Sequence, residues 1–131
     1  MMEQSGEKIL FREECFRIIG ICMKIHSTLR RGFKEAVYKD ALEIELQNHR
    51  IPYQREKSFA IQYEGKILPH NFIADFFVYD AIILEIKAVQ SLPYESFNQT
   101  LNYLKASQVE LGLLINFGEQ KLNYKRIICS Y

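Results

Sequence analysis

Two apolar segments separated by a short break constrain the fold of this chain most strongly. Residues 71–79 and 81–89 are rich in Phe, Ile, Val and Leu, and the break at Tyr79-Asp80 suits a tight turn. We expect two neighbouring strands joined as a hairpin. The second strand is apolar on both faces, which is typical of a strand in the middle of a buried sheet.

Three charged residues interrupt this apolar hairpin. Asp75 lies on the first strand, and Glu85 and Lys87 lie on the second. Side chains two positions apart share a face of a strand, so Glu85 and Lys87 point the same way, and pairing can bring Asp75 beside them. An unpaired charge in apolar surroundings is costly. The pattern fits a divalent-metal site with a lysine beside it, and it also fits an ordinary charge pair on a strand.

The composition indicates one globular domain, which we expect to span residues 1–131. Of the residues, 48% are hydrophobic, 25% charged and 13% aromatic. The chain has 17 basic and 16 acidic residues and a net charge of +1, so it lacks the global basic field that alone would indicate a nucleic-acid partner. Contact with phosphate would have to come from a local patch or from a bound metal.

The cysteines and the first residues predict a cytoplasmic protein. Cys15, Cys22 and Cys129 lack the close pairing of a zinc or redox motif, and the spacing of Cys15 and Cys22 places both on one helical face as small core residues. Residues 1–8 show no secretion signal, and no apolar run reaches the roughly 18 residues of a membrane span. We therefore expect a reducing compartment and no membrane anchor.

Hydrophobic periodicity places the other elements. Helices are predicted over residues 7–29, 33–48 and 94–107, with Pro52 preventing continuation of the second and Pro93 opening the third. Strands are predicted over residues 54–63, over the hairpin within 67–89, at 111–117 and at the edge, 124–128. The order α-α-β-β-β-α-β-β predicts an α/β fold with helices flanking a mixed central sheet, because the strand–helix–strand unit 82–117 makes two strands parallel.

This order resembles the PD-(D/E)XK nuclease superfamily, whose restriction-endonuclease-like core is α-β-β-β-α-β with metal ligands on the second and third strands. Asp75 and the Glu85-Ile86-Lys87 segment occupy those positions. The proline that precedes the aspartate in the superfamily is Ala74 here, and that proline coordinates nothing.

A narrower resemblance concerns the GxxExxY family, a small prokaryotic family of this superfamily. Gly32, Glu35 and Tyr38 match the pattern that names it. Residues 73–76, 84–89, 99–106 and 112–118 resemble the same family in order. The start of the third helix, residues 94–98, lacks the histidine found in many relatives, which removes any auxiliary role of that residue.

The resemblance implies a nuclease that uses Mg²⁺ or Mn²⁺ to hydrolyse phosphodiester bonds, with DNA as the expected substrate. Asp75, Glu85 and the backbone carbonyl of Ile86 are the implied metal ligands. Lys87 has no lone pair while protonated, so it would orient the attacking water or stabilise charge that develops at phosphorus. A salt bridge to Glu85 or Asp75 is the alternative for Lys87.

Three helical residues complete the expected site. The first core helix of the superfamily often supplies an acid to the metal, which implies Glu35; alternatively the helix dipole alone favours a carboxylate there. Gln99 and Tyr103 share a helical face, and their spacing resembles the exonuclease-like branch, where the glutamine stands beside the lysine. A half-exposed polar helix face is the alternative. Tyr38 lies one turn after Glu35 on the same helical face; its phenol can either hydrogen-bond to the site or pack, and we expect it to pack.

The remaining polar residues give weaker signals. The histidines, His26, His49 and His70, have no ligand spacing and are expected at the surface or as caps. The candidate phosphate contacts are Arg30, Arg31, Lys121, Lys125 and Arg126, although a solvated charge cluster explains any one of them better.

A second class of function stays open. The alternative to an enzyme is a non-catalytic nucleic-acid-binding or protein-binding module on a nuclease fold, for which a homodimer is one arrangement. The acids and the lysine favour the enzyme, whereas the small size and near-zero net charge favour the module. Fold alone does not decide between them.

Overall fold

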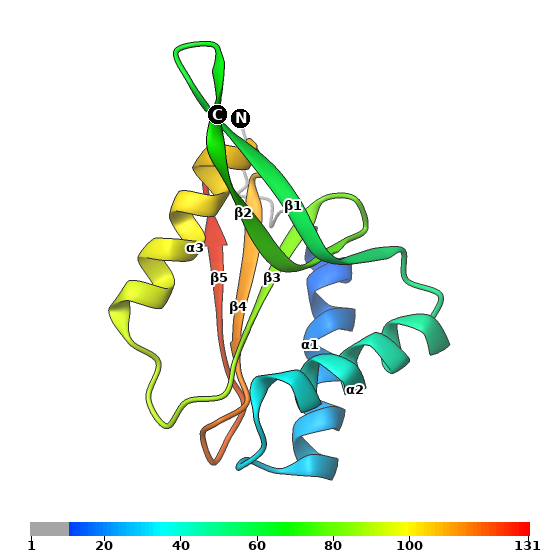
Figure 1. The fold of residues 1–131 in the computed structure, drawn as a ribbon. Coiled ribbons are helices and arrows are strands. Elements are labelled where there is room, and N and C mark those ends of the chain that lie inside the picture. The colour runs from blue at the N-terminus through cyan, green and yellow to red at the C-terminus, as the bar shows by residue number, and fades with distance from the viewer. Residues whose placement is uncertain (1–10) are drawn as a thin grey trace, which may run out of the picture.

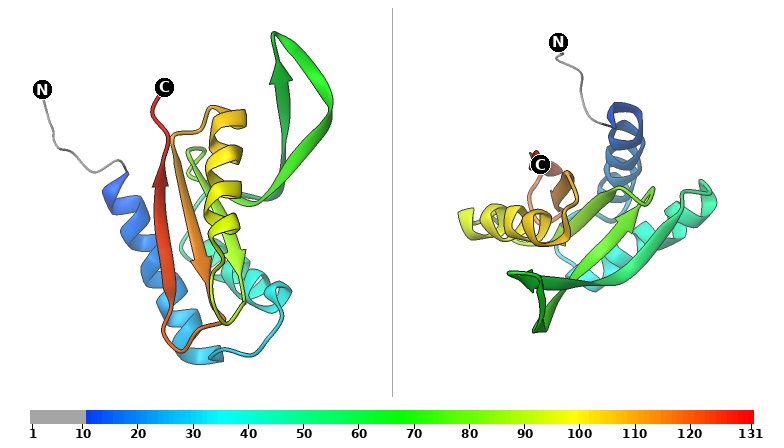
Figure 2. Two further views of the ribbon diagram at one scale, coloured as in Figure 1. Left: turned by 90° about the vertical axis from the view of Figure 1, so that its left-hand side faces the viewer. Right: turned by 90° about the horizontal axis from the view of Figure 1, so that it is seen from above.

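The computed structural model describes residues 11–131 and has a five-stranded sheet with helices on both faces (Figures 1 and 2). The helices are α1 (Arg12–Leu29), α2 (Glu35–Asn48) and α3 (Tyr94–Ser107). The strands are β1 (Tyr53–Tyr63), β2 (Lys66–Val78), β3 (Ile82–Lys87), β4 (Leu111–Asn116) and β5 (Asn123–Ile128). The predicted element order and the α/β class are confirmed.

The sheet is mixed, as predicted, with the strand order β1-β2-β3-β4-β5. β3 and β4 are parallel from the pair Ile82 and Leu111 onward, and the other neighbours are antiparallel. Tyr79 and Asp80 form the turn between β2 and β3 with φ values of 55° and 54°. Two successive positive φ angles are those of a type I′ turn, whose twist matches the flanking strands, so the predicted tight hairpin is present.

Two apolar clusters hold the layers together. Beneath α1 and α2, residues such as Ile18 and Leu42 pack on Leu84 and Ile86 of β3. Beneath α3, Leu104 packs with Ile83 and other residues of the opposite sheet face. β3 is therefore covered on both faces, which explains why its sequence is apolar throughout.

The β1–β2 hairpin twists from one cluster to the other, and its tip projects beyond the rest of the sheet (Figure 1). Phe76 belongs to the cluster beneath α1 and α2, whereas Ala74, two residues earlier, belongs to the cluster beneath α3. Asp75 lies at this change of face. On β1, between the residues paired with Phe76 and Ala74, Glu56 adopts a left-handed backbone with φ 58°. Such a conformation is uncommon for a residue with a side chain.

Two boundaries differ from the prediction for reasons visible in the structure. β3 ends at Lys87, two residues early, because the backbone N–H and C=O of Val89 bond to the side chain of Asn116 at 3.0 and 2.9 Å. α2 begins at Glu35 because Lys34 is extended, with φ −71° and ψ 158°. β2 begins at Lys66, five residues before the apolar segment 71–79 and one before the predicted start of the hairpin, and the remaining strand ends lie within one residue of the prediction.

The first helix also begins later than predicted. Phe11 is left-handed, with φ 51°, and α1 starts at Arg12. The predicted helical residues 7–10, and the expectation that residues 1–8 carry no signal, lie outside the described residues. Within residues 11–131, no helix is long and apolar enough to cross a membrane.

Candidate active site

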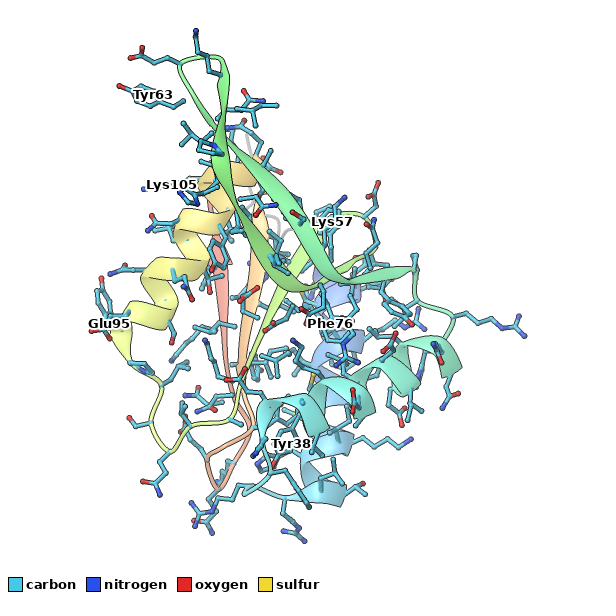
Figure 3. All side chains as sticks on the ribbon, in the orientation of Figure 1. Tyr38, Lys57, Tyr63, Phe76, Glu95 and Lys105 are labelled. Carbon is cyan, nitrogen blue, oxygen red and sulfur yellow. The ribbon has the colours of Figure 1, made fainter. Side chains whose placement is uncertain are left out.

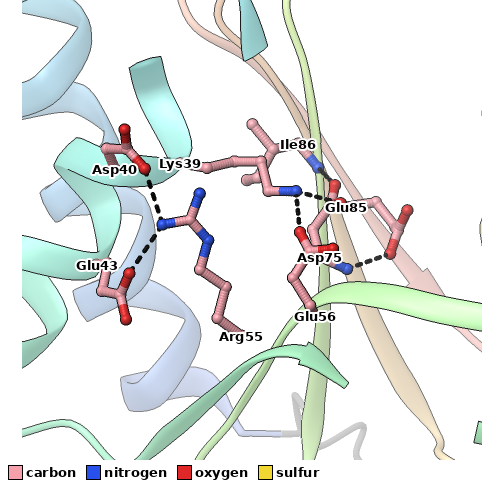
Figure 4. A network of polar contacts seen from close by, with 8 residues as sticks. All are labelled: Lys39, Asp40, Glu43, Arg55, Glu56, Asp75, Glu85 and Ile86. Atoms are coloured by element: carbon pink, nitrogen blue, oxygen red, sulfur yellow. Dashed lines mark hydrogen bonds and ion pairs between the residues drawn. The ribbon is translucent and has the colours of Figure 1, made fainter. Parts of the chain in front are cut away.

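Asp75 and Glu85 meet where β2 and β3 separate. The last paired residues of the two strands are Phe76 and Leu84. Beyond this pair, the two carboxylates accept hydrogen bonds from the backbone in place of strand-to-strand hydrogen bonds. The Asp75 N–H donates to Glu85 Oε2 at 3.1 Å, and the Ile86 N–H donates to Asp75 Oδ2 at 2.7 Å (Figure 4). Each acid is thus held by a backbone amide of the opposite strand, which fixes both carboxylates in place.

Glu85 is the buried member of this pair, with only 6% of its surface exposed. Burial, followed by the negative charge of Asp75, raises the pKa of Glu85 to about 8. A bound cation would relieve both effects, since it replaces lost solvation and screens the two carboxylates from each other. The electrostatics therefore favour a cation at this position.

Lys39, on α2, supplies positive charge to the acids. Its Nζ lies 3.0 Å from Asp75 Oδ1 and 2.5 Å from Glu56 Oε2 (Figure 4). Burial alone would lower the pKa of Lys39, but hydrogen bonds to Glu56 and Asp75 outweigh it, and the net pKa is raised. Lys39 thus stays charged and acts as the counter-ion of Asp75.

Sequence reasoning did not identify Lys39 or Glu56. The signal for Lys39 was its position four residues after Glu35, hence on the same face of α2 as a suspected site residue. Glu56 gives no comparable signal, because its approach to Lys39 depends on how the twisted β1–β2 hairpin lies against α2.

Lys87 lies at the end of β3, half-buried, and its charge acts on Glu85 in the direction that opposes the effect of burial. Lys87 forms no ion pair with any of residues 11–131, so neither salt bridge considered from the sequence is present. Its backbone carbonyl accepts a hydrogen bond from the Phe117 N–H at 2.8 Å. The strand end is therefore anchored while the ammonium has no carboxylate partner in the part of the chain described.

Of the predicted helical residues, Tyr103 is the one whose side chain is affected by the charges of the acids. The ring of Tyr103 stacks on Phe72 with centroids 4.1 Å apart. Burial, followed by the charges of Glu85 and Asp75, raises the pKa of the phenol. The phenol therefore keeps its proton and remains a hydrogen-bond donor near the acids.

Glu35 and Gln99 are not brought into contact with the acids. Glu35 is the first residue of α2, and Gln99 lies on α3; both are exposed. Neither side chain hydrogen-bonds to Asp75, Glu85 or Lys87. The roles expected for Glu35 and Gln99 thus remain predictions.

The histidines lie away from the acid pair. His26 is buried, so the expected surface or capping position is wrong for this residue, and it shares a hydrogen bond with the Glu119 carbonyl at 2.8 Å. His49 shares a hydrogen bond with the Glu45 carbonyl at 2.9 Å. His70 is exposed on the projecting hairpin. None of the three contacts Asp75 or Glu85.

The oxygen donors fit a magnesium or manganese ion by their chemistry. Mg²⁺ takes hard oxygen ligands and is usually bound by one or two carboxylates, with water completing its shell. Asp75 and Glu85 supply two carboxylates, and the Ile86 carbonyl is a third hard oxygen on the same strand. Residues 11–131 contain no cluster of three or more His, Cys, Asp or Glu that could hold a metal, so water would have to contribute much of the shell.

Comparison with known proteins agrees with this geometry. The family model of the PD-(D/E)XK nuclease superfamily matches residues 12–127. The crystal structure of SSO0001 is similar, with a TM-score of 0.55 and 20% identity over 73% of this chain and 50% of that chain. The alkaline exonuclease LHK-Exo from Laribacter hongkongensis is similar, with a TM-score of 0.54 and 11% identity over 98% of this chain and 73% of that chain.

These structural likenesses concern the fold, because the identities are low. The chain spans only half the length of SSO0001. Comparison with curated protein sequences gives no significant match.

Proposed function

Since the chain belongs to the PD-(D/E)XK nuclease superfamily, we propose that it is a metal-dependent nuclease that hydrolyses phosphodiester bonds, with DNA as its substrate. The observation that carries the proposal is the acid pair. Asp75 and Glu85 are fixed by each other's strands, and Lys87 follows on the same strand without a described ion-pair partner. This set supplies metal-binding oxygens and a positive charge at one place.

Asp75, Glu85 and the Ile86 carbonyl would hold Mg²⁺ or Mn²⁺ in this proposal. A bound metal supplies Lewis acidity toward a phosphate oxygen and lowers the pKa of a coordinated water. Lys87 would orient the attacking water or stabilise negative charge on the phosphoryl oxygens, because its ammonium is not engaged by a described carboxylate. Lys39 holds Asp75 and Glu56 in the absence of metal.

The other predicted residues would act around this centre. Tyr103 keeps its proton and can donate a hydrogen bond to a phosphate oxygen. Gln99, one turn earlier on α3 and exposed, can contact substrate. Glu35, one turn before Lys39 on α2, can reach the metal through a water.

We also infer that the chain belongs to the GxxExxY family and acts in the cytoplasm of a prokaryote. Gly32 has φ 119°, a backbone conformation that favours glycine, and Tyr38 is fully buried. The structure thus explains the residue type at two positions of the GxxExxY pattern. Cys15 and Cys22 are buried free thiols and Cys129 is a half-buried one, in keeping with a reducing compartment.

A non-catalytic binding module, as a monomer or a homodimer, is the second candidate. The observation in its favour is Lys39, which already neutralises Asp75 and Glu56 and so stabilises the acids without a metal. Cleavage distinguishes the two candidates directly.

The test incubates the full-length protein with labelled single-stranded DNA, duplex DNA and RNA in Mg²⁺, Mn²⁺ or EDTA. We expect DNA cleavage that requires metal and that Asp75→Asn lowers by roughly 100-fold or more, since a ligand and its charge are lost. Glu95→Gln, at an exposed acid of α3, is the matched control and should cleave normally. Wild-type protein that cleaves no substrate with either metal would favour the binding module.

A further inference from the structure

The loop between α1 and α2, residues 30–34, is basic and exposed. Arg30, Arg31 and Lys34 are all solvent-exposed, and none forms an ion pair with another residue in the described range 11–131. Phe33, between the cations, is 48% exposed although it is a large apolar side chain. The loop thus presents three cations without protein counter-charges and an aromatic ring without full cover.

A cavity lies between this loop and the end of β3. It has a volume of about 410 Å³ and is lined by Arg31, Gly32, Phe33, Ala88, Gln90 and Gly118. This volume falls within the range of about 300–1,000 Å³ that is typical of small-ligand sites. Ala88 directly follows Lys87, so the cavity begins one residue beyond the candidate catalytic lysine.

The loop is held rigidly beside that strand end. The Tyr38 hydroxyl donates to the Arg30 carbonyl at 2.6 Å and accepts from the Phe33 N–H at 3.2 Å. The Tyr38 ring stacks on Phe117 with centroids 4.7 Å apart, and the Phe117 N–H donates to the Lys87 carbonyl. The loops at residues 30–34, 88–93 and 117–122 gather at the lower end of Figure 1, where Figure 3 labels Tyr38.

The backbone of the loop is strained in a way that these contacts maintain. Arg30 has φ 61°, uncommon for a residue with a side chain, and its N–H donates to the His26 carbonyl at 2.8 Å. Strained conformations persist where surrounding contacts determine them, and they often mark ligand-binding segments. Tyr38 and His26 therefore fix the direction in which the loop presents its side chains.

We propose that this loop and cavity bind an unpaired nucleotide of the substrate, with Phe33 stacking on its base and the three cations contacting neighbouring phosphates. An aromatic ring stacks most readily on a base whose face is open, as in a single strand, and cations without protein partners suit a phosphate backbone. The inference rests on the proposed nuclease function and narrows its substrate to single-stranded DNA or to duplexes with single-stranded ends.

The test measures binding of the full-length protein to a fluorescein-labelled single-stranded DNA 12-mer and to the matching duplex. EDTA is present so that bound DNA is not cleaved. Phe33→Leu should weaken single-strand binding by roughly 5- to 150-fold, the range for loss of one base stack, and change duplex binding little. The double variant Arg30→Gln, Arg31→Gln should weaken binding to the single strand and to the duplex. Each lost phosphate contact should reduce the magnitude of the slope of log binding constant against log salt concentration by about 0.7 for the single strand.

Two variants serve as matched controls. Phe16→Leu removes an aromatic ring that is 80% exposed on α1. Lys105→Gln removes an exposed cation near the C-terminal end of α3. Both should bind like wild type. Thermal melts check that each variant is folded, which we expect because every substituted side chain is exposed.

Several outcomes would overturn the inference. The first is that wild-type protein binds the single strand no more tightly than the duplex. The second is that the Phe33→Leu and arginine variants bind like their controls. The third is that a polyglutamate peptide binds as tightly as the DNA strand and with the same dependence on Phe33. Failure of the proposed function is distinguishable. If the protein binds single strands through Phe33 but never cleaves them, the binding inference stands and the proposed nuclease activity is wrong. If the variants of Phe33 and of the arginines cleave as fast as wild type, the nuclease activity stands and the binding inference is wrong.

Discussion

Lys39 Nζ lies 3.0 Å from Asp75 Oδ1 and ties α2 to the acid that we assign to the metal. The same ammonium contacts Glu56 on β1, so one cation joins three elements around the site (Figure 4). The side chain of Lys39 is only 12% exposed, whereas that of Glu56 is 54% exposed. A divalent cation bound by Asp75 would compete with this ammonium for the same carboxylate.

Lys39→Met should therefore lower metal-free stability and enlarge the response to metal. Removing one partner of a partly buried ion pair costs about 1–3 kcal/mol, between the values for exposed and buried pairs. Because binding to the folded state raises its stability, the rise in melting temperature on adding Mg²⁺ should be larger in the variant than in wild type. Melts in EDTA and in Mg²⁺ measure both quantities.

Lys24→Met is the matched control for this prediction. Lys24 pairs with Glu45 at 3.0 Å, but its side chain is exposed and the pair lies between α1 and α2. Its loss should leave the metal response unchanged. Equal Mg²⁺ shifts in wild type and Lys39→Met would show that Lys39 and the metal do not share a carboxylate.

Glu85→Gln should stabilise the metal-free protein increasingly as pH rises. Glu85 has a folded pKa of about 8, above the ordinary value of about 4.3, so the folded state binds the proton more tightly than the unfolded state. Between these values the unfolded state carries fewer protons, and the contribution of Glu85 to stability falls with pH, by at most about 1.4 kcal/mol per pH unit. Glutamine removes this loss.

Urea unfolding of wild type and Glu85→Gln in EDTA, at several pH values between 5 and 8.5, measures the difference in free energy of unfolding. The difference should grow with pH and level off above about pH 8. Glu95→Gln, at an exposed acid, should show no such growth. A constant difference across the range would mean that the pKa of Glu85 is not raised.

Two glycines should respond oppositely to alanine. A Cβ at Gly118 would lie 2.3 Å from the N and O atoms of Val89, which is backbone and must shift, so Gly118→Ala should destabilise by roughly 2 kcal/mol or more. Gly20, within α1, has nothing within 4 Å of an added Cβ, so Gly20→Ala should stabilise by up to about 1 kcal/mol. Thermal melts give both signs, and tolerance of Gly118→Ala would contradict the close approach of the loops.

The hairpin and its acids could be predicted because they depend on local pattern. Two apolar runs around Tyr79-Asp80 determine the pairing, and the pairing brings Asp75 toward Glu85. The contact between Lys39 and Asp75 depends on how α2 packs on the sheet, which no period in the sequence encodes. The four-residue spacing of Gln99 and Tyr103 indicates a shared helical face, but not that the charges of the acids would act on the phenol of Tyr103.

The early end of β3 could not be predicted from the sequence for a similar reason. The apolar pattern continues to Val89, so periodicity extends the strand, but the side chain of Asn116 captures the backbone of Val89. Asn116 is fully buried at the end of the neighbouring strand, and its importance appears only once β3 and β4 are aligned. Such a long-range polar contact lies beyond pattern reasoning.

The proposed role of Lys87 in cleavage can be tested by substitution. If its ammonium stabilises the transition state, Lys87→Ala should keep DNA binding and the Mg²⁺-induced rise in melting temperature but lose cleavage, because an interaction made mainly in the transition state affects rate more than affinity. We expect a loss of roughly 100-fold or more, comparable to removal of a single oxyanion-stabilising donor. Lys87→Arg should not restore the full rate, because a planar guanidinium does not replace a compact ammonium.

A purely structural lysine would behave in the opposite way. Lys87→Ala would then lower metal-free stability and cleave normally once Mg²⁺ is added. The structure favours the first outcome, because Lys39 is the counter-ion of Asp75 and Lys87 has no ion-pair partner among residues 11–131. Single-turnover cleavage at saturating Mg²⁺ makes the comparison, and equal rates for wild type and Lys87→Ala would remove Lys87 from the mechanism.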